Sequence, residues 1–405
     1  MTSEKQCEAL KGQAAGQAAG QAEGLASGLV EGLAEGLTAD VTEADERLFA
    51  SLVDTSLDEA MRERIVAPAV VMPAQDSVLA VHWHPEHVPL DLIRQRIQAS
   101  YPNMRKSLII PTQHNELMEY GPYTGVEVDC YSRGFNQKVQ LLLHFRTKRL
   151  AQAHTLKSML AHTHAYRSSQ LFDYLSTVTR PDEERLSLAA RESGSDEAVV
   201  ACARACCLKL AALLERHAGD MPVDSIKNKL VRNFVDGLRP LLGNALANRV
   251  QVFLKEVKAV VKARFPLSYF YRTSEFIEEA RGLGGGVVIP HPEQFWPILL
   301  ANYDVDGYEV WNPQSQRYTE FLISVLYEKN RRRGNGERRM LVFMGDDTHM
   351  GEKTLAVSGA ANGAKARREI GLQPAWDDLA IGKKLIVADM DRVRIIEEYG
   401  ARLDG

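Results

Sequence analysis

Short apolar runs alternate with amphipathic stretches in two separate parts of the chain. Four runs of strand length lie between residues 77 and 145, each ending in polar residues, and the pattern returns after residue 276. Such runs predict buried strands, whereas apolar positions three or four residues apart predict helices. The repeated order of strand, polar tip and helix indicates an α/β domain of parallel strands, with functional groups on the loops at their carboxyl ends.

The middle of the chain follows the period of a helix instead. The clearest helical runs are residues 149–178, 197–219 and 231–265, and no convincing strand pattern interrupts them. We therefore expect an α-helical insert or cap over residues 146–275. The α/β domain is expected in two parts, residues 77–145 and 276–405.

The N-terminal part has no pattern typical of a core. Glycine occupies every fourth position from Gly12 to Gly36, and each glycine costs a helix about 1 kcal/mol relative to alanine. We expect residues 1–40 to form a low-complexity tail, flexible or partly helical, with a docking segment as the alternative. Residues 41–76 are expected to form a helical linker that ends near Pro68 and Pro73.

Composition narrows the class of protein. With 405 residues and a formal charge of -4, the chain has no global attraction to nucleic acid or anionic membranes, so any site for a polyanion must be local. Its five cysteines are odd in number and show no framework spacing, which favours a reducing compartment. Because we find no signal peptide and no membrane-spanning stretch, we expect a soluble cytoplasmic protein without a membrane partner. The oligomeric state is left open.

Metal-binding residue types gather at or near the ends of the apolar runs. They are His82, His84, His87, His114, Glu127, His144, His291, Asp347 and His349. Imidazole and carboxylate groups are the ligands that borderline divalent metals prefer. A bridging carboxylate can hold two such ions close enough to activate water against a phosphate ester. The pattern favours a multinuclear metallohydrolase over the alternative that these are ordinary polar residues at strand ends.

The order of the motifs points to a family. They are H-x-H, T-x-H-N, G-V-E-V, an apolar run closing in histidine, G-G-V-V-I-x-H-P, G-Y-E-V-x-N and G-D-D-x-H. This series resembles the polymerase and histidinol phosphatase (PHP) superfamily of metal-dependent phosphoesterases, over residues 77–145 and 276–405. The resemblance implies a distorted (β/α)7, TIM-like barrel with a large helical insertion. It also implies two or three divalent ions (Mn, Zn or Fe) at the carboxyl ends of the strands.

The resemblance also implies which residues hold each ion. The first ion would be held by His82, His84 and Asp347, with Glu127 as a bridge. The second would be held by Glu127, His144 and His291, and the third by His114, His349 and His87. Glu127, Asp347 and His349 are the expected catalytic residues.

Two departures from the family pattern affect the third ion. Gln113 stands where the family usually has aspartate, and the loop after His84 is shorter than usual. Glu86 and Asp91 therefore remain alternatives to His87.

Other polar residues are expected to have secondary roles. Glu309 and Asn312 would orient ligands rather than bind metal. Arg133, Arg146 and Lys353 are candidate phosphate-binding cations without support from a motif. The second His-x-His, at His162 and His164, lies in a helical run where positions i and i+2 do not share a face, so we interpret it as structural. Cys202, Cys206 and Cys207 are interpreted as ordinary buried cysteines.

The sequence therefore predicts a hydrolase that acts on a phosphomonoester, with a nucleotide or a small phosphorylated metabolite as substrate. One alternative is a single-strand nuclease, suggested by the basic run at residues 331–339. Another is a non-catalytic metal-binding regulatory protein, to which Gln113 gives some weight.

Overall fold

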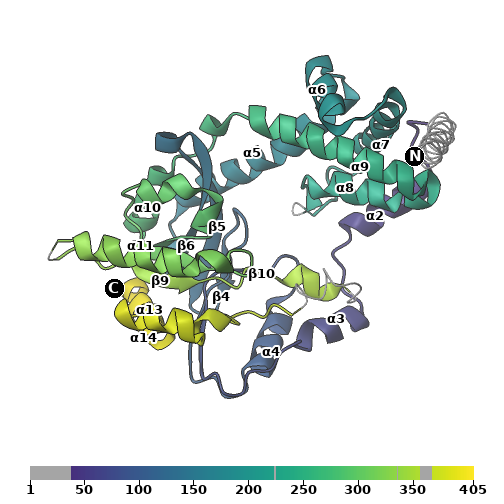
Figure 1. The fold of residues 1–405 in the computed structure, drawn as a ribbon. Helices are drawn as coiled ribbons and strands as arrows, with labels where there is room; N and C mark the ends of the chain where they lie inside the picture. The colour runs from purple at the N-terminus through teal and green to yellow at the C-terminus, as the bar shows by residue number, and fades with distance from the viewer. Residues whose placement is uncertain (1–37, 223–224, 335, 356–366) are drawn as a thin grey trace, which may run out of the picture. The chain divides into compact units, whose positions relative to one another are not determined.

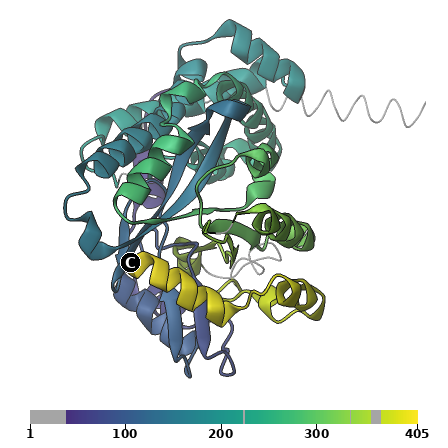
Figure 2. The same cartoon turned by 90° about the vertical axis from the view of Figure 1, so that its left-hand side faces the viewer.

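The computed structural model describes residues 38–222, 225–334, 336–355 and 367–405. The glycine-patterned segment lies outside these ranges. The chain divides into two compact units, each described below by itself. The helical unit comprises Met1–Thr55 and Ser168–Phe265, and the α/β unit comprises Ser56–Arg167 and Pro266–Gly405. Figures 1 and 2 show the ribbon in two views.

The helical unit is built from α-helices around one apolar core. Its helices are α2 (Glu43–Val53), α6 (Glu183–Ser193), α7 (Glu197–Arg216), α8 (Lys229–Gly237) and α9 (Arg239–Arg264), together with the last part of α5 (His154–Thr179). The side chains of Thr42 and Asp196 accept hydrogen bonds from the first turns of α2 and α7, which satisfies amide groups that a helix leaves free. Of the insert expected at residues 146–275, the helical unit contains only Ser168–Phe265, and it also includes α2.

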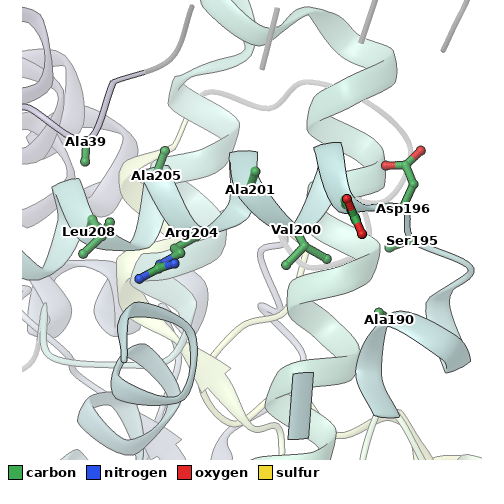
Figure 3. A pocket seen from close by; sticks show the side chains of 10 residues that line it. Ala39, Ala190, Ser195, Asp196, Val200, Ala201, Arg204, Ala205 and Leu208 are labelled. Carbon is green, nitrogen blue, oxygen red and sulfur yellow. The ribbon is translucent and has the colours of Figure 1, made fainter. Parts of the chain in front are cut away.

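The cysteines of α7 lie in the core of this unit. Cys202, Cys206 and Cys207 are buried among the apolar residues of the core, as expected of structural cysteines. Beside them, one face of α7 and the preceding turn form an open hollow of about 540 Å³, lined mainly by small and apolar side chains (Figure 3).

The α/β unit carries all the described strands. The largest sheet has six strands in the order β4-β5-β6-β7-β8-β9. These are β4 (Met118–Tyr120), β5 (Tyr123–Ser132), β6 (Gln137–Arg146), β7 (Gly286–Ile289), β8 (Gly307–Trp311) and β9 (Leu341–Met344). Two further pairs are parallel: β1 (Ser77–Ala80) with β3 (Lys106–Ile109), and β2 (Trp83–His84) with β10 (Thr348–His349).

Helices pack against these sheets. The α-helices of the unit are α3 (Glu59–Val66), α4 (Leu90–Ser100), the first part of α5, α10 (Thr273–Gly282), α11 (Thr319–Arg332), α13 (Leu379–Val387) and α14 (Arg392–Asp404). Short 3-10 helices are η1 (Arg133–Phe135), η2 (Thr147–Leu150), η4 (Leu267–Tyr269), η5 (Pro292–Gln294), η6 (Trp296–Leu300), η7 (Gln316–Tyr318), η8 (Met350–Thr354) and η9 (Pro374–Trp376). Helix α14 contacts β1, β3, β6 and β9, so it connects the small sheet to the large one.

The unit is a mixed α/β fold, and its described strands do not close into the expected barrel. Strand pairs β5–β6 and β6–β7 are antiparallel, whereas β7–β8 and β8–β9 are parallel. The expectation of all-parallel strands was wrong here because residues 133–136 alone connect β5 to β6, and a parallel crossover needs about a dozen residues or more. None of the helices in the described ranges is both long and apolar enough to cross a membrane.

Candidate metal centre

The first and last histidine motifs lie side by side in the α/β unit. Strands β2 and β10 pair so that His84 faces His349 and Trp83 faces Thr348, and the Asp347 amide donates to the His82 carbonyl at 3.0 Å. Trp83 is buried in an apolar cluster with residues of α4, and side chains alternate along a strand. Both imidazoles of His82-x-His84 are therefore turned to the opposite side, toward Asp347.

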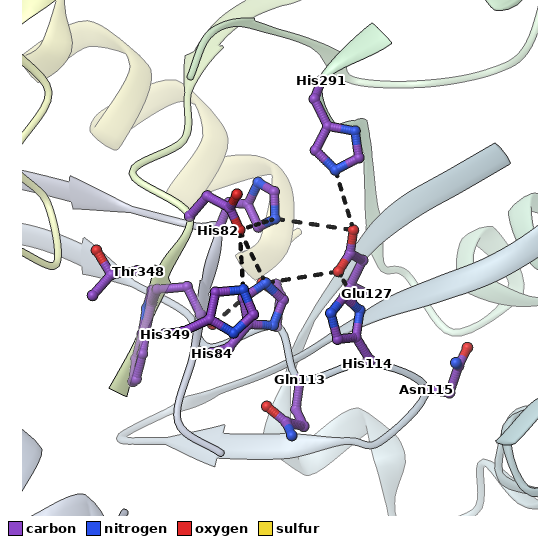
Figure 4. Close-up of polar contacts among 12 residues, drawn as sticks. His82, His84, Gln113, His114, Asn115, Glu127, His291, Thr348 and His349 are labelled. Carbon is purple, nitrogen blue, oxygen red and sulfur yellow. Dashed lines mark hydrogen bonds and ion pairs between the residues drawn. The ribbon is translucent and has the colours of Figure 1, made fainter. Parts of the chain in front are cut away.

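Glu127 lies at the middle of the cluster (Figure 4). Its neighbours Val126 and Val128 point into the main core, so the alternation of β5 turns Glu127 to the other face. Backbone hydrogen bonds join Glu127 to Gln113 and Asn115 at 3.0 and 2.7 Å. These bonds hold the intervening His114 beside it, with Nδ1 2.6 Å from Glu127 Oε2.

Seven side chains form three overlapping groups with metal-ligand spacing. The groups are His84, His114 and His349; His82, His84 and Asp347; and His82, Glu127 and His291. Within each group the ligand atoms lie within 4.8 Å of one another. Five imidazoles and two carboxylates thus converge on one place, with ligand types that suit Zn, Mn or Fe better than the all-oxygen sites of Ca or Mg.

Buried polar atoms without hydrogen-bond partners support a metal at this place. Among the described residues they include Nε2 of His82 and both ring nitrogens of His84. An unsatisfied buried polar group costs about 1–3 kcal/mol, and charged groups cost more. Because the two Nε2 atoms face one another inside the cluster, divalent ions would satisfy them together. The residues present fit the metal that the motifs imply.

Each carboxylate lies between two sets of imidazoles. Oε1 of Glu127 is 3.4 Å from His291 Nε2, and Oε2 is 3.7 Å from His84 Nε2. Oδ1 of Asp347 is 3.7 Å from His82 Nε2, 3.4 Å from His84 Nε2 and 3.6 Å from His349 Nε2. Both carboxylates would therefore be available to hold divalent ions together with either set of imidazoles.

Glu309 fixes the ring of His82. Its Oε2 lies 2.5 Å from His82 Nδ1, and its Oε1 accepts from the side-chain amide of Asn312 at 3.0 Å. With Nδ1–H donating to the carboxylate, Nε2 is the nitrogen that would bind a metal in exchange for its proton. Burial disfavours a charged His82, but Glu309 outweighs this effect and raises the pKa of His82 to about 10. The same carboxylate would support the charge of an ion at Nε2.

Other shifts in the cluster act in both directions. Burial disfavours charge on His291 and His349, but Glu127 raises the pKa of His291. Asp347 and Glu86 raise the pKa of His349 to about 9. Metal binding would therefore displace a proton from each of these two rings.

Burial, with the nearby His114 and His349, lowers the pKa of His84 to about 3, which keeps it neutral. Burial opposes ionisation of Glu127 and Asp347, yet neighbouring histidines hold the pKa of each carboxyl well below its usual range. Neutral imidazoles and ionised carboxylates are the metal-binding forms.

The rim of the cluster includes Glu86, one of the alternatives left open by the sequence. Its Oε1 lies 3.0 Å from His349 Nδ1, and its Oε2 accepts from the Gly351 amide at 2.8 Å. Gln113 accepts from the Glu86 backbone amide at 3.2 Å, so its side chain positions this loop and belongs to none of the three groups. Asp91 is exposed in the first turn of α4.

His144 and His87 are not brought into the groups, contrary to expectation. Both nitrogens of His144 already have partners, the Tyr399 hydroxyl at 2.8 Å and the Val81 carbonyl at 3.0 Å. No lone pair remains for a metal, and burial lowers the pKa of His144 to about 3. His87 is exposed, because the chain turns at Glu86 through a positive φ of 52°. In the group with Glu127 and His291, His82 occupies the place expected for His144.

Two of the candidate phosphate-binding cations, Arg146 and Lys353, have partners outside the three metal-ligand groups. Arg146 is paired with Asp404 and lies over the ring of Tyr123, and buried Lys353 donates to the Arg368 carbonyl. Gln314 was missed: its amide donates to Asp347 Oδ2 at 3.0 Å. A lone glutamine two residues after G-Y-E-V-x-N carries no signal in a single sequence.

Comparisons with known proteins give one distant likeness among solved structures. No family model and no curated protein matches the chain. A crystal structure from Bifidobacterium adolescentis, provisionally assigned as a metal-dependent phosphoesterase, is similar to it with 16% identity and a TM-score of 0.37. The alignment covers 79% of this chain and 98% of that one. The assignment of the centre rests on its own ligand geometry.

Proposed function

We propose that the protein is a metal-dependent phosphoesterase, a hydrolase that uses divalent ions held around Glu127. The observation that carries this proposal is the convergence of five imidazoles and two carboxylates, in which Nε2 of His82 and Nε2 of His84 are buried without a hydrogen-bond partner among the described residues. The motif order, which resembles the PHP superfamily, supports the same chemistry.

The count of free nitrogens favours two ions. Nδ1 of His82 is used by Glu309, so His82 offers a single nitrogen and can serve only one of its two groups. Filling the group of His82, Glu127 and His291 leaves the group of His84, His114 and His349 complete, because the two sets share no residue. Glu127 and Asp347 each lie within 4.0 Å of imidazoles from both sets and would help to hold both ions.

The surrounding residues would bind and orient the reacting groups. Divalent ions bound here would lower the pKa of a coordinated water toward about 7 and neutralise charge on the phosphate. The side chains of His82, His84 and Glu127 are each 1% exposed, whereas those of His114 and His349 are 28% and 27% exposed. A phosphate would therefore approach from the side of His114 and His349. Glu86 would hold His349 in place through Nδ1.

The substrate that fits best is a phosphomonoester of a nucleotide or small metabolite, and a cytoplasmic location agrees with the free cysteines of the described residues. The basic run gives the nuclease alternative little support, since Arg338 contacts Asp306 and Arg339 contacts Asp389. Two of its arginines are therefore tied to this unit.

Phosphate release tests the proposal. The full chain is incubated with Mn, Zn or Fe and an aryl phosphate, nucleotides, sugar phosphates and a labelled oligonucleotide. We expect metal-dependent release of phosphate that chelator abolishes and that Asp347→Asn reduces at least about 100-fold, because Asp347 would help to hold the ions. Asp304→Asn, an exposed acid of the same unit, is the matched control.

Absence of turnover on every substrate with every metal would contradict the proposal. Degradation of the oligonucleotide alone would favour the nuclease. Binding of at least one equivalent of metal without any turnover would favour the metal-binding regulatory protein.

A further inference from the structure

A second hollow of the α/β unit has a chemistry unlike that of the metal cluster. It encloses about 530 Å³ between the end of β5, helix α5 and the segment that leads into α10. That volume is within the range of small-molecule sites. Its lining combines aromatic rings, an imidazole and two guanidinium groups, and we name it the aromatic pocket: Tyr131, Arg133, His162, Ser268, Tyr269, Phe270, Tyr271, Arg272 and Glu275.

The rings of the aromatic pocket are held in place before any ligand arrives. The ring of Tyr269 stacks on Tyr166 with centroids 5.4 Å apart, although 62% of Tyr269 is exposed. His162, from the second His-x-His, contacts the Tyr269 carbonyl at 3.0 Å and meets the ring of Tyr271 edge-on. The Tyr131 amide donates to the Tyr271 carbonyl at 2.9 Å. Large exposed rings fixed in this way can serve as stacking surfaces at low entropic cost.

Two arginines of the pocket carry charge that the described residues do not neutralise. Arg133 and Arg272 are exposed, and neither forms an ion pair within the described ranges. The carboxylate in the lining, Glu275, accepts from the Arg272 backbone amide at 2.6 Å. Nearby Lys138 differs, since it is paired with Asp129 at 2.6 Å. Unpaired guanidinium groups beside fixed rings suit a ligand with a planar ring and a phosphate.

We propose that the aromatic pocket binds a nucleotide, with the base on Tyr269 and the phosphate on Arg133 and Arg272. Tyr131 lies four residues beyond Glu127 along β5, a distance of about 13 Å at the rise of a strand, so this pocket is separate from the metal cluster. Binding requires no metal and does not depend on the proposed hydrolase activity.

The test is calorimetric titration of the full chain in EDTA, so that the metal cluster takes no part. Adenosine monophosphate should bind, and adenosine or ribose 5-phosphate should each bind at least about tenfold more weakly, because each lacks one of the two recognised groups. Tyr269→Ala should weaken binding about tenfold and Tyr269→Phe should restore it, as stacking predicts. The Arg133→Ala and Arg272→Ala double variant should weaken the monophosphate but not adenosine. Arg331→Ala, an exposed arginine elsewhere, is the control.

A ten-nucleotide oligothymidylate distinguishes the source of the ligand. Tighter binding than the mononucleotide, lost in Tyr269→Ala, would identify single-stranded nucleic acid as the ligand, whereas equal or weaker binding would identify a free nucleotide. Absence of binding by either ligand at millimolar concentration overturns the proposal. Binding that is unchanged in the folded Tyr269 and arginine variants overturns it equally.

Discussion

Replacement of Glu309 by glutamine tests the assignment of His82 as a metal ligand without altering a ligand itself. Glu309 is 1% exposed and lies 2.5 Å from Nδ1 of His82. Glutamine keeps the size of the side chain and removes its charge. The ring of His82 would lose the partner that fixes its tautomer and supports positive charge on its far nitrogen.

The magnitude follows from the kind of bond that is lost. A buried hydrogen bond to a charged group contributes about 1.5–3 kcal/mol, and each 1.4 kcal/mol changes an equilibrium constant about tenfold. The ion held by His82, Glu127 and His291 should therefore bind roughly 10- to 150-fold more weakly in Glu309→Gln. The ion held by His84, His114 and His349 should change much less, because no residue of that set contacts Glu309.

Competition with a chromophoric chelator measures both affinities in one titration. Glu398→Gln, which removes a partly buried acid of α14 that pairs with Arg402, controls for the loss of one negative charge. Two binding steps are expected. In Glu309→Gln, only the step assigned to His82, Glu127 and His291 should weaken. If Glu309→Gln binds both ions within threefold of the unaltered protein, the proposed role of His82 is refuted.

Three further outcomes are expected. His144→Gln should lower the free energy of unfolding in urea by about 1–3 kcal/mol yet leave the metal content unchanged; loss of one equivalent would restore His144 as a ligand. Asp306→Asn should cost about 3–5 kcal/mol, since it removes the charge of a fully buried carboxylate that pairs with the largely buried Arg281, whereas Asp304→Asn should cost under about 1 kcal/mol. Burial opposes the charge of Asp306, but Arg281 outweighs it and lowers the pKa of Asp306. That stabilisation is therefore complete above pH 3.8 and lost as the pH falls through the lower folded value, so Asp306→Asn should flatten the acid limb of an unfolding curve. Metal at 100 times its Kd should stabilise the chain by about 2.7 kcal/mol, measured as a rise in Tm that EDTA reverses; an unchanged Tm would contradict metal binding to the folded state.

The elements were readable from the sequence because each carries a local signal. Apolar runs gave the strands that hold Glu127 and Glu309, and helical periodicity gave α7 and α9. The direction of the strands was not readable from apolar runs alone, since β5 and β6 look the same in either orientation. The short connection at residues 133–136 indicates an antiparallel pair, because it is too short for a parallel crossover.

Which histidines enter the cluster depends on contacts distant in sequence. His144 and His291 each follow or end an apolar run, and the pattern treats them alike. They differ because Tyr399, from the last helix, and the Val81 carbonyl occupy both nitrogens of His144. The residues near His144 in the sequence do not predict its contact with Tyr399.

The contact that removes His144 from the cluster still serves the cluster. Nε2–H of His144 donates to the carbonyl of Val81, the residue directly before His82-x-His84. Its Nδ1 accepts from the Tyr399 hydroxyl, on a helix that packs against β1 and β6. The residue expected as a ligand therefore fixes the backbone that carries two ligands. A histidine at a motif position can therefore support a metal site through the backbone that carries the ligands. For His144, the partners of its two nitrogens distinguish this supporting role from direct metal binding.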